Sequence, residues 1–291
     1  MADIRLAIAL MALLSVVLFT TTVRLLRQRS PLFLDFMGIV AILLLGAYLQ
    51  LVWGQLWIVN WIPLPSVIVL ANWFPLLLGF LAAIVWLRMK QHPLWRRIPV
   101  QVALIAMTVW SVIYVIPREP PDCNNEWIAR YPGDPLTYCR QTTTETCSAA
   151  SAATLLATLG IDTTEQEMAE LCLTRHGTSW LGLYHGLSWK LLGTDRVVQL
   201  FEADAGHLRT MCAEQPVLLC CELTDDTAAV NPQLVNEDGW QPGVAHSVVC
   251  FGHNEHGFLI ADPSQPQPET WDDRYLNALW TGTGLRIIAT E

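Results

Sequence analysis

Four long apolar stretches dominate the first 117 residues of the chain. They cover residues 4–23, 33–51, 67–87 and 100–116. A helix needs about 20 residues to cross the ~30 Å hydrocarbon core of a bilayer. Four consecutive stretches of this length are not typical of buried helices in a water-soluble protein, so they predict four membrane-spanning helices. We expect Asp35 to lie at the mouth of the second span and Pro75 to kink the third.

The segments between the spans differ in charge, and this difference predicts an orientation. Three arginines follow the first span and four basic residues follow the third, whereas Gly54–Ser66 is uncharged and contains Trp57 and Trp61. Basic loops face the cytoplasm, and tryptophans gather at membrane interfaces. Both termini and the domain after Pro117 should therefore lie on the extracytoplasmic face. Because positive charge follows the first apolar stretch, we expect an uncleaved anchor and not a signal peptide.

The net charge changes sign after the fourth apolar stretch. Residues 1–117 hold eight basic and two acidic residues, a net +6, and residues 118–291 hold nine basic and 24 acidic ones, a net −15. An acidic domain lacks the Lys/Arg face that binds phosphates, which excludes a nucleic-acid partner. We expect a linker over residues 118–137, with a stiff Pro-rich exit at 117–121, and a folded domain over 138–291.

Helical and strand-like segments alternate in the acidic half, which indicates a mixed α and β domain. Cys147–Leu159 is rich in Ala and Leu, and Gly160 follows it where a helix C-terminus favours glycine. Thr164 opens a second helix with a capping-box sequence, and a third is expected over Trp180–Leu192. Short β-rich segments follow at residues 197–201, 217–221, 247–251, 258–261 and 285–289.

Cys147 lies in the first turn of the first of these helices. The unpaired backbone N–H groups and the positive end of the helix dipole favour a thiolate there, and the thiolate is the nucleophilic form of cysteine. A small buried side chain is the alternative, and it is the common role of a free cysteine. Cys147 is therefore a candidate nucleophile.

The C-terminal strands contain a candidate base. Two strand-like runs that include His246 and Asp262 are joined by a turn-rich segment. A hairpin centred on Asn254 would place His246 opposite Asp262, with Cβ atoms about 4.5–5.5 Å apart. Asp262 would then hold the imidazole in the tautomer that a general base requires. A polar cross-strand pair without chemistry is the alternative.

Gln141 lies six residues before Cys147 in a Thr-rich loop. A side-chain amide at this place can donate a hydrogen bond to a developing oxyanion, and the backbone N–H of Cys147 can supply a second donor. Taken alone, a glutamine in such a loop is more commonly a surface residue. Gln141 is therefore a candidate oxyanion donor only in combination with Cys147.

The segment Gln141-Thr-Thr-Thr-Glu-Thr-Cys147-Ser-Ala-Ala-Ser resembles the Gln-then-Cys motif of the bacteriocin-processing, double-glycine-leader peptidases, a papain-like cysteine peptidase family. The resemblance covers most of residues 138–288 and none of residues 1–117. It implies an α+β papain-like domain, with helices packed on an antiparallel sheet, which would follow the four-span α-helical transmembrane bundle that the apolar stretches predict. It also implies a bacterial inner membrane as the location, and no cofactor or metal.

The resemblance implies a role for each candidate residue. Cys147 would be the nucleophile and His246 the general base. Asp262 would orient His246, and Gln141 would bind the oxyanion. The sequence departs from the family in three respects: serine and not glycine follows the cysteine, an acidic loop-like insertion occupies residues 222–245, and no nucleotide-binding cassette follows. Family members joined to exporters work on the cytoplasmic side, whereas the loop charges place this domain outside.

Other cysteines and histidines carry weaker hypotheses. Cys123 and Cys139 lie close in sequence, and an oxidising compartment would permit a disulfide between them. His253 and His256 have no partner at a metal-ligand spacing and are interpreted as turn residues.

These observations predict a membrane-anchored cysteine peptidase that hydrolyses double-glycine-type leaders or other small peptides. Two alternatives remain from the sequence: a catalytically silent peptide-binding sensor, and amidase or acyl-transfer chemistry on cell-wall peptides. The expected partners are a peptide or protein substrate and the lipid bilayer. The sequence does not identify a separate transporter or membrane partner. The spans hold almost no charge, which favours anchoring over transport.

Overall fold

The computed structural model describes residues 2–90, 92–113, 115–116, 119–129 and 137–290. The chain divides into two compact units, Met1–Pro117 and Arg118–Glu291. The predicted exit at 117–121 lies partly outside the described residues, as does the predicted linker at 118–137.

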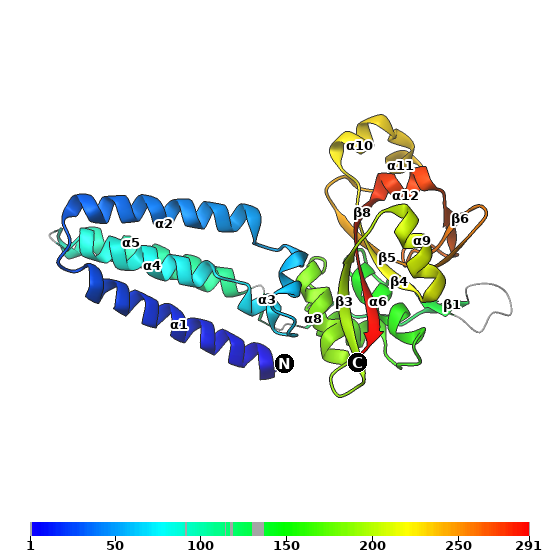
Figure 1. Ribbon diagram of the computed structural model, residues 1–291, viewed down its shortest axis with the longest axis horizontal. Helices are drawn as coiled ribbons and strands as arrows, with labels where there is room; N and C mark the ends of the chain where they lie inside the picture. The colour runs from blue at the N-terminus through cyan, green and yellow to red at the C-terminus, as the bar shows by residue number, and fades with distance from the viewer. Residues whose placement is uncertain (1, 91, 114, 117–118, 130–136, 291) are drawn as a thin grey trace. The chain divides into compact units, whose positions relative to one another are not determined.

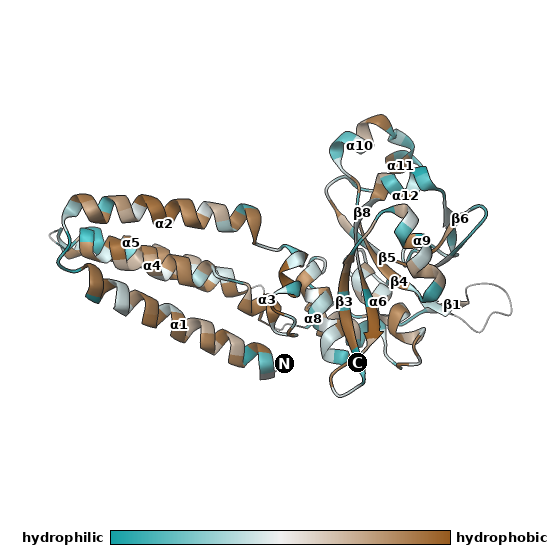
Figure 2. Ribbon diagram, in the orientation of Figure 1, coloured by the Kyte–Doolittle hydropathy of each residue, from teal (hydrophilic) through white to brown (hydrophobic). Residues whose placement is uncertain are grey.

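The first unit is made of apolar helices connected by short turns (Figures 1 and 2). They are α1 (Ala2–Leu26), α2 (Pro31–Leu51), the 3-10 helix η1 (Leu56–Asn60), α3 (Val67–Leu70), α4 (Phe74–Arg88) and α5 (Leu94–Ile113). Among the described residues, four segments are long and apolar enough to cross a membrane: residues 3–26, 31–51, 67–88 and 94–113. Each predicted span therefore coincides with a helical segment of the required length and composition, the third made of α3 and α4.

Helix α4 lies at the centre of this unit and packs against α1, α2 and α5. A small buried cluster of Leu34, Ala41 and Ile84 joins it to α2. Most other apolar side chains of α1, α2 and α5 face outward, as they would toward lipid. At one end of the unit, Arg88 Nε donates to Asp35 Oδ1 at 2.6 Å. Asp35, expected at the mouth of the second span, is thus paired within the protein.

The third predicted span is interrupted between α3 and α4. The Tyr48 hydroxyl donates to the Ala71 carbonyl at 2.9 Å and accepts from the Trp73 N–H at 3.1 Å, which satisfies backbone groups that leave the helix there. Pro75 lies in the first turn of α4, where proline is tolerated. The expected irregularity at Pro75 is therefore present as a break: Pro75 has no N–H for the Ala71 carbonyl four residues earlier, and the span divides there into α3 and α4.

The second unit is built around a six-stranded antiparallel sheet in the order β3-β8-β4-β5-β6-β7. The strands are β3 (Arg196–Glu202), β4 (Val217–Glu222), β5 (Ala245–Asn254), β6 (Gly257–Ala261), β7 (Glu269–Trp271) and β8 (Trp280–Ala289). A separate antiparallel pair joins β1 (Trp127–Ala129) to β2 (Thr137–Cys139). Part of the segment predicted as a linker is therefore a strand of this unit.

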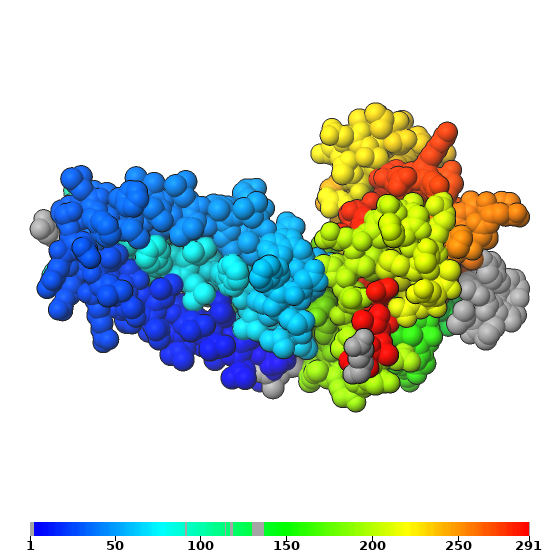
Figure 3. All heavy atoms as spheres, viewed as in Figure 1, coloured from blue at the N-terminus to red at the C-terminus, as the bar shows by residue number. Residues whose placement is uncertain are grey.

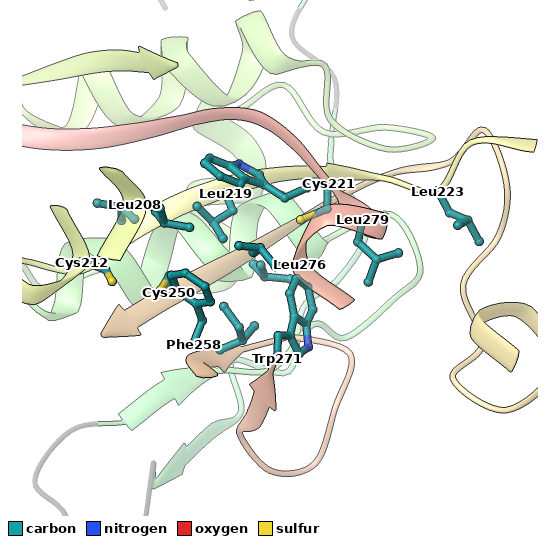
Figure 4. Close-up of a cluster of buried hydrophobic side chains, with 14 of the residues drawn as sticks. Leu208, Cys212, Leu219, Cys221, Leu223, Cys250, Phe258, Trp271, Leu276 and Leu279 are labelled. Atoms are coloured by element: carbon teal, nitrogen blue, oxygen red, sulfur yellow. The ribbon is translucent and has the colours of Figure 1, made fainter. Parts of the chain in front are cut away.

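The second unit has seven helices among the described residues, and several of them pack on the large sheet. They are α6 (Cys147–Ala157), α7 (Glu165–Leu171), α8 (Trp180–Lys190), α9 (Ala205–Glu214), α10 (Asp225–Val230), α11 (Pro232–Asn236) and α12 (Asp273–Leu279). Leu208 and Leu276 bring α9 and α12 against alternate residues of β4 and β5, including Leu219 and Cys250 (Figure 4). Helices α6 and α8 contact the same sheet with small and apolar side chains.

The segment 222–245 is not the loop that its acidic sequence suggests. It forms α10 and α11, which stand out as a yellow lobe of the second unit in Figure 3. The Thr224 hydroxyl caps α10 by accepting from the Thr227 N–H. Leu234 and Trp240 anchor the segment in the main core, and the Trp240 N–H donates to the Leu234 carbonyl at 2.9 Å.

Candidate active site

Cys147 is the first residue of α6, as predicted, and it is 6% exposed. The helix is buried over almost its whole length because alanines on several sides allow neighbouring elements to approach closely. It packs against β2 and β5. This packing holds the sulfur at the end of the helix where free N–H groups point outward.

His246 acts on Cys147. Its ring lowers the pKa of the Cys147 thiol, and the backbone of Ser247 acts in the same direction. Burial alone would raise the pKa of the Cys147 thiol, but the hydrogen bonds and the positive charge of His246 outweigh it and lower that pKa. The pair therefore favours a thiolate and an imidazolium.

Asp262 binds the other side of the imidazole. His246 Nε2 lies 2.8 Å from Asp262 Oδ1, which leaves Nδ1 for the sulfur. Burial of His246 would lower its pKa, but the Asp262 charge and hydrogen bond, together with Cys147, raise that pKa to about 10. The same Oδ1 accepts from the Ser264 N–H at 2.8 Å and from its hydroxyl at 2.7 Å. Burial would raise the pKa of Asp262, and these contacts lower it.

The hairpin register differs from the prediction. Val249 pairs with Ala261 and Cys250 with Ile260, with a bulge before Gly252. His246 is therefore not directly opposite Asp262. The prediction failed because it assumed a symmetric turn about Asn254, whereas Asn254 pairs with Gly257 across a two-residue turn. The two side chains meet all the same.

The loop that contains Gln141 is fixed from two sides. The Gln141 N–H donates to the Pro263 carbonyl at 2.9 Å, next to Asp262. The buried carboxylate of Glu165 accepts from both the N–H and the hydroxyl of Thr142, each at 2.6 Å. The Gln141 side chain lines a recess with His246, and its Oε1 is buried without a hydrogen-bond partner among the described residues. This oxygen can only accept, so an oxyanion would have to be bound by the Gln141 amide nitrogen.

Trp240 is a site residue that the sequence did not reveal. Its ring meets the His246 ring edge to face, with centroids 5.2 Å apart and planes at 90°. The Trp271 ring lies 6.0 Å from the indole and 5.2 Å from the ring of Tyr275, whose hydroxyl donates to Asp238 at 3.0 Å. No spacing rule predicts that a tryptophan in an acidic insertion contacts a histidine six residues later. The sequence signal for this contact was only that Trp240 is a large aromatic residue in an otherwise polar segment.

Two adjoining recesses flank the Cys147–His246 pair. One, about 200 Å³ in volume, is lined by Gln141, Trp240, His246 and Asp262. The other, about 520 Å³, is lined by Cys147 and, among others, Glu145, His176 and Ser179. Thr144, Gln241 and Val244 line both. A chain that crosses from one recess to the other would pass the sulfur.

The structure also places the other cysteines and histidines for which the sequence suggested a hypothesis. Cys123 and Cys139 are free thiols in the structure, and burial, with the negative charge of Glu165, raises the pKa of each to about 12. The hypothesised disulfide is thus not formed. His253 pairs with Phe258 within the hairpin and is a strand residue, while His256 lies in the turn. Among the described residues, no His, Cys, Asp or Glu side chains gather as metal ligands.

No family model matches the chain, and no curated protein matches it in sequence. Among solved structures, it is similar to the peptidase domain of Streptococcus ComA, a bi-functional ABC transporter involved in a quorum-sensing pathway (19% identity, 52% of this chain and 96% of that one, TM-score 0.38). It is also similar to a double-glycine motif protease from an AMS/PCAT transporter in complex with the leader peptide (14% identity, 59% and 97%, TM-score 0.39).

A third similar structure is the N-terminal C39-like peptidase domain of the toxin secretion ATP-binding protein from Vibrio parahaemolyticus (11% identity, 51% and 100%, TM-score 0.35). The predicted arrangement of helices on an antiparallel sheet is present in the structure itself. The roles of individual residues depend on the geometry given above.

Proposed function

We propose that the protein is a membrane-anchored cysteine peptidase that hydrolyses peptide bonds with Cys147 as nucleophile. One observation carries the proposal: His246 Nε2 is 2.8 Å from Asp262 Oδ1, and the residues that follow Cys147 and His246 are in contact, with Ser148 Oγ 2.8 Å from Ser247 Oγ. A candidate nucleophile at the start of α6, a base and a residue that orients the base are thus gathered at one place.

In the proposed mechanism, the Cys147 thiolate attacks the carbonyl carbon of the substrate. The carbonyl oxygen becomes an oxyanion that accepts hydrogen bonds from the Gln141 amide and the Cys147 N–H. The His246 imidazolium protonates the departing amine as the C–N bond breaks, which leaves a thioester on Cys147. Water then attacks the thioester with His246 as base, and the acid product leaves as the thiolate is restored.

The two recesses suggest where the residues on each side of the scissile bond would bind. The departing amine must reach His246, so the recess lined by His246 and Trp240 would take the residues after the scissile bond. The larger recess beside Cys147 would take the acyl side. Its volume of about 520 Å³ has room for side chains larger than glycine. The proposed substrates are therefore small peptides or leader segments, without restriction to double-glycine sites.

The proposed location of the catalytic domain is the extracytoplasmic face of a bacterial inner membrane. The support is the charge of the connections: the turns after α1 and α4 are basic, whereas the segment between α2 and α3 is uncharged. The two basic turns lie at the same end of the helical unit, where Arg88 pairs with Asp35 (Figure 1). Basic turns on one side of a four-span unit favour that side as cytoplasmic.

The deciding experiment uses the full chain in detergent with a peptide library and a cell-wall digest supplied side by side. Wild-type protein should cleave peptides, and Cys147→Ala should abolish cleavage while the thermal unfolding transition is kept. A thiol electrophile should label Cys147 faster than it labels a free thiol. Undiminished cleavage by Cys147→Ala would refute the proposal, and turnover of the cell-wall digest alone would reassign the substrate class.

A further inference from the structure

The proposed nucleophile and the proposed base are each followed by a serine, and these two serines contact each other. Ser148 Oγ lies 2.8 Å from Ser247 Oγ. Ser148 is 2% exposed and Ser247 is fully buried. The hydrogen bond therefore joins the helix that contains Cys147 to the strand that contains His246, at the residues directly after the reacting pair.

The Ser148 hydroxyl also approaches the nucleophile. Ser148 Oγ lies 3.9 Å from Cys147 Sγ, within hydrogen-bond range for sulfur. Each hydroxyl has one proton to donate, and a thiolate can only accept. When Cys147 is ionised, the arrangement that satisfies all three groups has Ser247 donating to Ser148 and Ser148 donating to the sulfur.

A third serine, Ser151, makes a contact between the same helix and strand that is only structural. Ser151, one turn further along α6, donates to the Ser247 backbone carbonyl at 2.7 Å. It is as buried as Ser148 and joins the same helix to the same strand residue. Its hydroxyl binds the backbone carbonyl of Ser247 and not the Ser247 hydroxyl. Ser151 therefore stabilises the packing of α6 on β5 but takes no part in the hydrogen bonds that lead from Ser247 through Ser148 to the sulfur.

We propose that Ser148 and Ser247 are positioning residues, which lock the Cys147–His246 pair in register and donate a hydroxyl hydrogen bond to the Cys147 thiolate. This inference rests on the proposed function, because it assigns these serines to the same reacting pair. It also gives the serine after Cys147 a role, where the family motif that the sequence resembles has glycine. A buried thiolate has few water molecules to solvate it, so a fixed hydroxyl donor stabilises it more than it would in solution.

The test measures the pH dependence of Cys147 alkylation by iodoacetamide in the full chain, with peptide-level mass spectrometry to separate Cys147 from the other cysteines. Ser148→Ala and Ser247→Ala should each raise the pH midpoint of alkylation by about one unit, since hydrogen bonds to charged groups are strong. The double variant should shift the midpoint little further, because both substitutions interrupt the same chain. Ser151→Ala is the matched control and should leave the midpoint unchanged while lowering thermal stability.

Two further variants keep the test decisive. Ser247→Thr retains the hydroxyl and should keep the wild-type midpoint, and Ser148→Gly should behave as Ser148→Ala does if the alanine variant unfolds. Equal midpoints in wild type, Ser148→Gly and Ser247→Ala would overturn the inference, as would a shift in Ser151→Ala of the same size. If wild-type Cys147 titrates as an ordinary thiol and no peptide is cleaved, the proposed function itself fails, which is a distinguishable result.

Discussion

Asp262 binds His246 through a 2.8 Å hydrogen bond although the two residues are not paired in the hairpin that contains them. Asp262 comes directly after β6, where the chain leaves the ladder. Its Oδ1 is fixed by the N–H and the hydroxyl of Ser264. The orientation of the imidazole therefore depends on a short turn after the strand, and cross-strand pairing does not provide it.

Asp262→Asn should move the alkaline limit of activity downward. The Asp262 charge helps to raise the pKa of His246 to about 10, so the wild-type imidazolium persists until the pH approaches that value. An uncharged amide removes this stabilisation, and His246 then loses its proton at lower pH. The pH dependence of kcat/KM measures the effect. If kcat/KM of wild type and of Asp262→Asn declined at the same alkaline pH, the assigned contact between Asp262 and His246 would be contradicted.

The Cys147–His246 pair should also make stability depend on pH. The folded-state pKa of His246 is raised, so its contribution is complete below the unfolded value of about 6.5 and is lost as the pH rises through about 10. The folded-state pKa of Cys147 is lowered, so its contribution is complete above the unfolded value of about 8.5 and is lost as the pH falls through the folded value.

Between pH of about 6.5 and about 8.5, folding only moves a proton from sulfur to imidazole, and the two dependences cancel. The stability difference between wild type and the double variant Cys147→Ala, His246→Ala should therefore be largest in this window and should shrink toward pH 5 and above pH 10. Thermal unfolding at a series of pH values measures it. A difference that keeps growing above pH 10 would be inconsistent with an ion pair.

Local sequence signals predicted the parts of this protein that local interactions determine. The spans, the helix that begins at Cys147 and the Thr164 cap depend on composition or on residues three or four apart, and all are present. Hairpin register depends on turn geometry, which several residue combinations satisfy, and the prediction was two residues off. The contact of Trp240 with His246 depends on how a whole insertion folds, and no local pattern encodes it.

Trp240→Ala should lower kcat more than it raises KM, because the indole excludes water from the His246–Asp262 hydrogen bond and meets the His246 ring directly. Trp240→Phe keeps an aromatic ring there and should retain most of the activity. Tyr275→Phe, which removes the hydrogen bond to Asp238 beside this aromatic group, should have a smaller effect than Trp240→Ala. Steady-state kinetics of folded protein would contradict this role if the alanine and phenylalanine variants were equally impaired.

Glu165→Gln should reduce both stability and kcat. Glu165 is fully buried and accepts two 2.6 Å hydrogen bonds from Thr142, the residue after Gln141. An amide retains one acceptor at most, so we expect a loss of about 1.5–3 kcal/mol in unfolding free energy and a displaced oxyanion donor. Glu167→Gln on the same helix is the control, because Glu167 is 43% exposed and binds Lys190 at the surface. That change should cost less than about 1 kcal/mol.

The proposed orientation predicts which connections of the helical unit face the outside of the cell. Gln55 lies in the uncharged segment before η1 and Lys90 lies between α4 and α5, and both are exposed. In intact cells, a membrane-impermeant maleimide should label Gln55→Cys and should label Lys90→Cys only after the membrane is permeabilised. Cells with the wild-type protein give the background labelling, which should be low because the cysteines of the protein are buried or half-buried. The reverse pattern would place the catalytic domain in the cytoplasm, because Gln55 and the chain after α5 lie on the same side of a four-span unit.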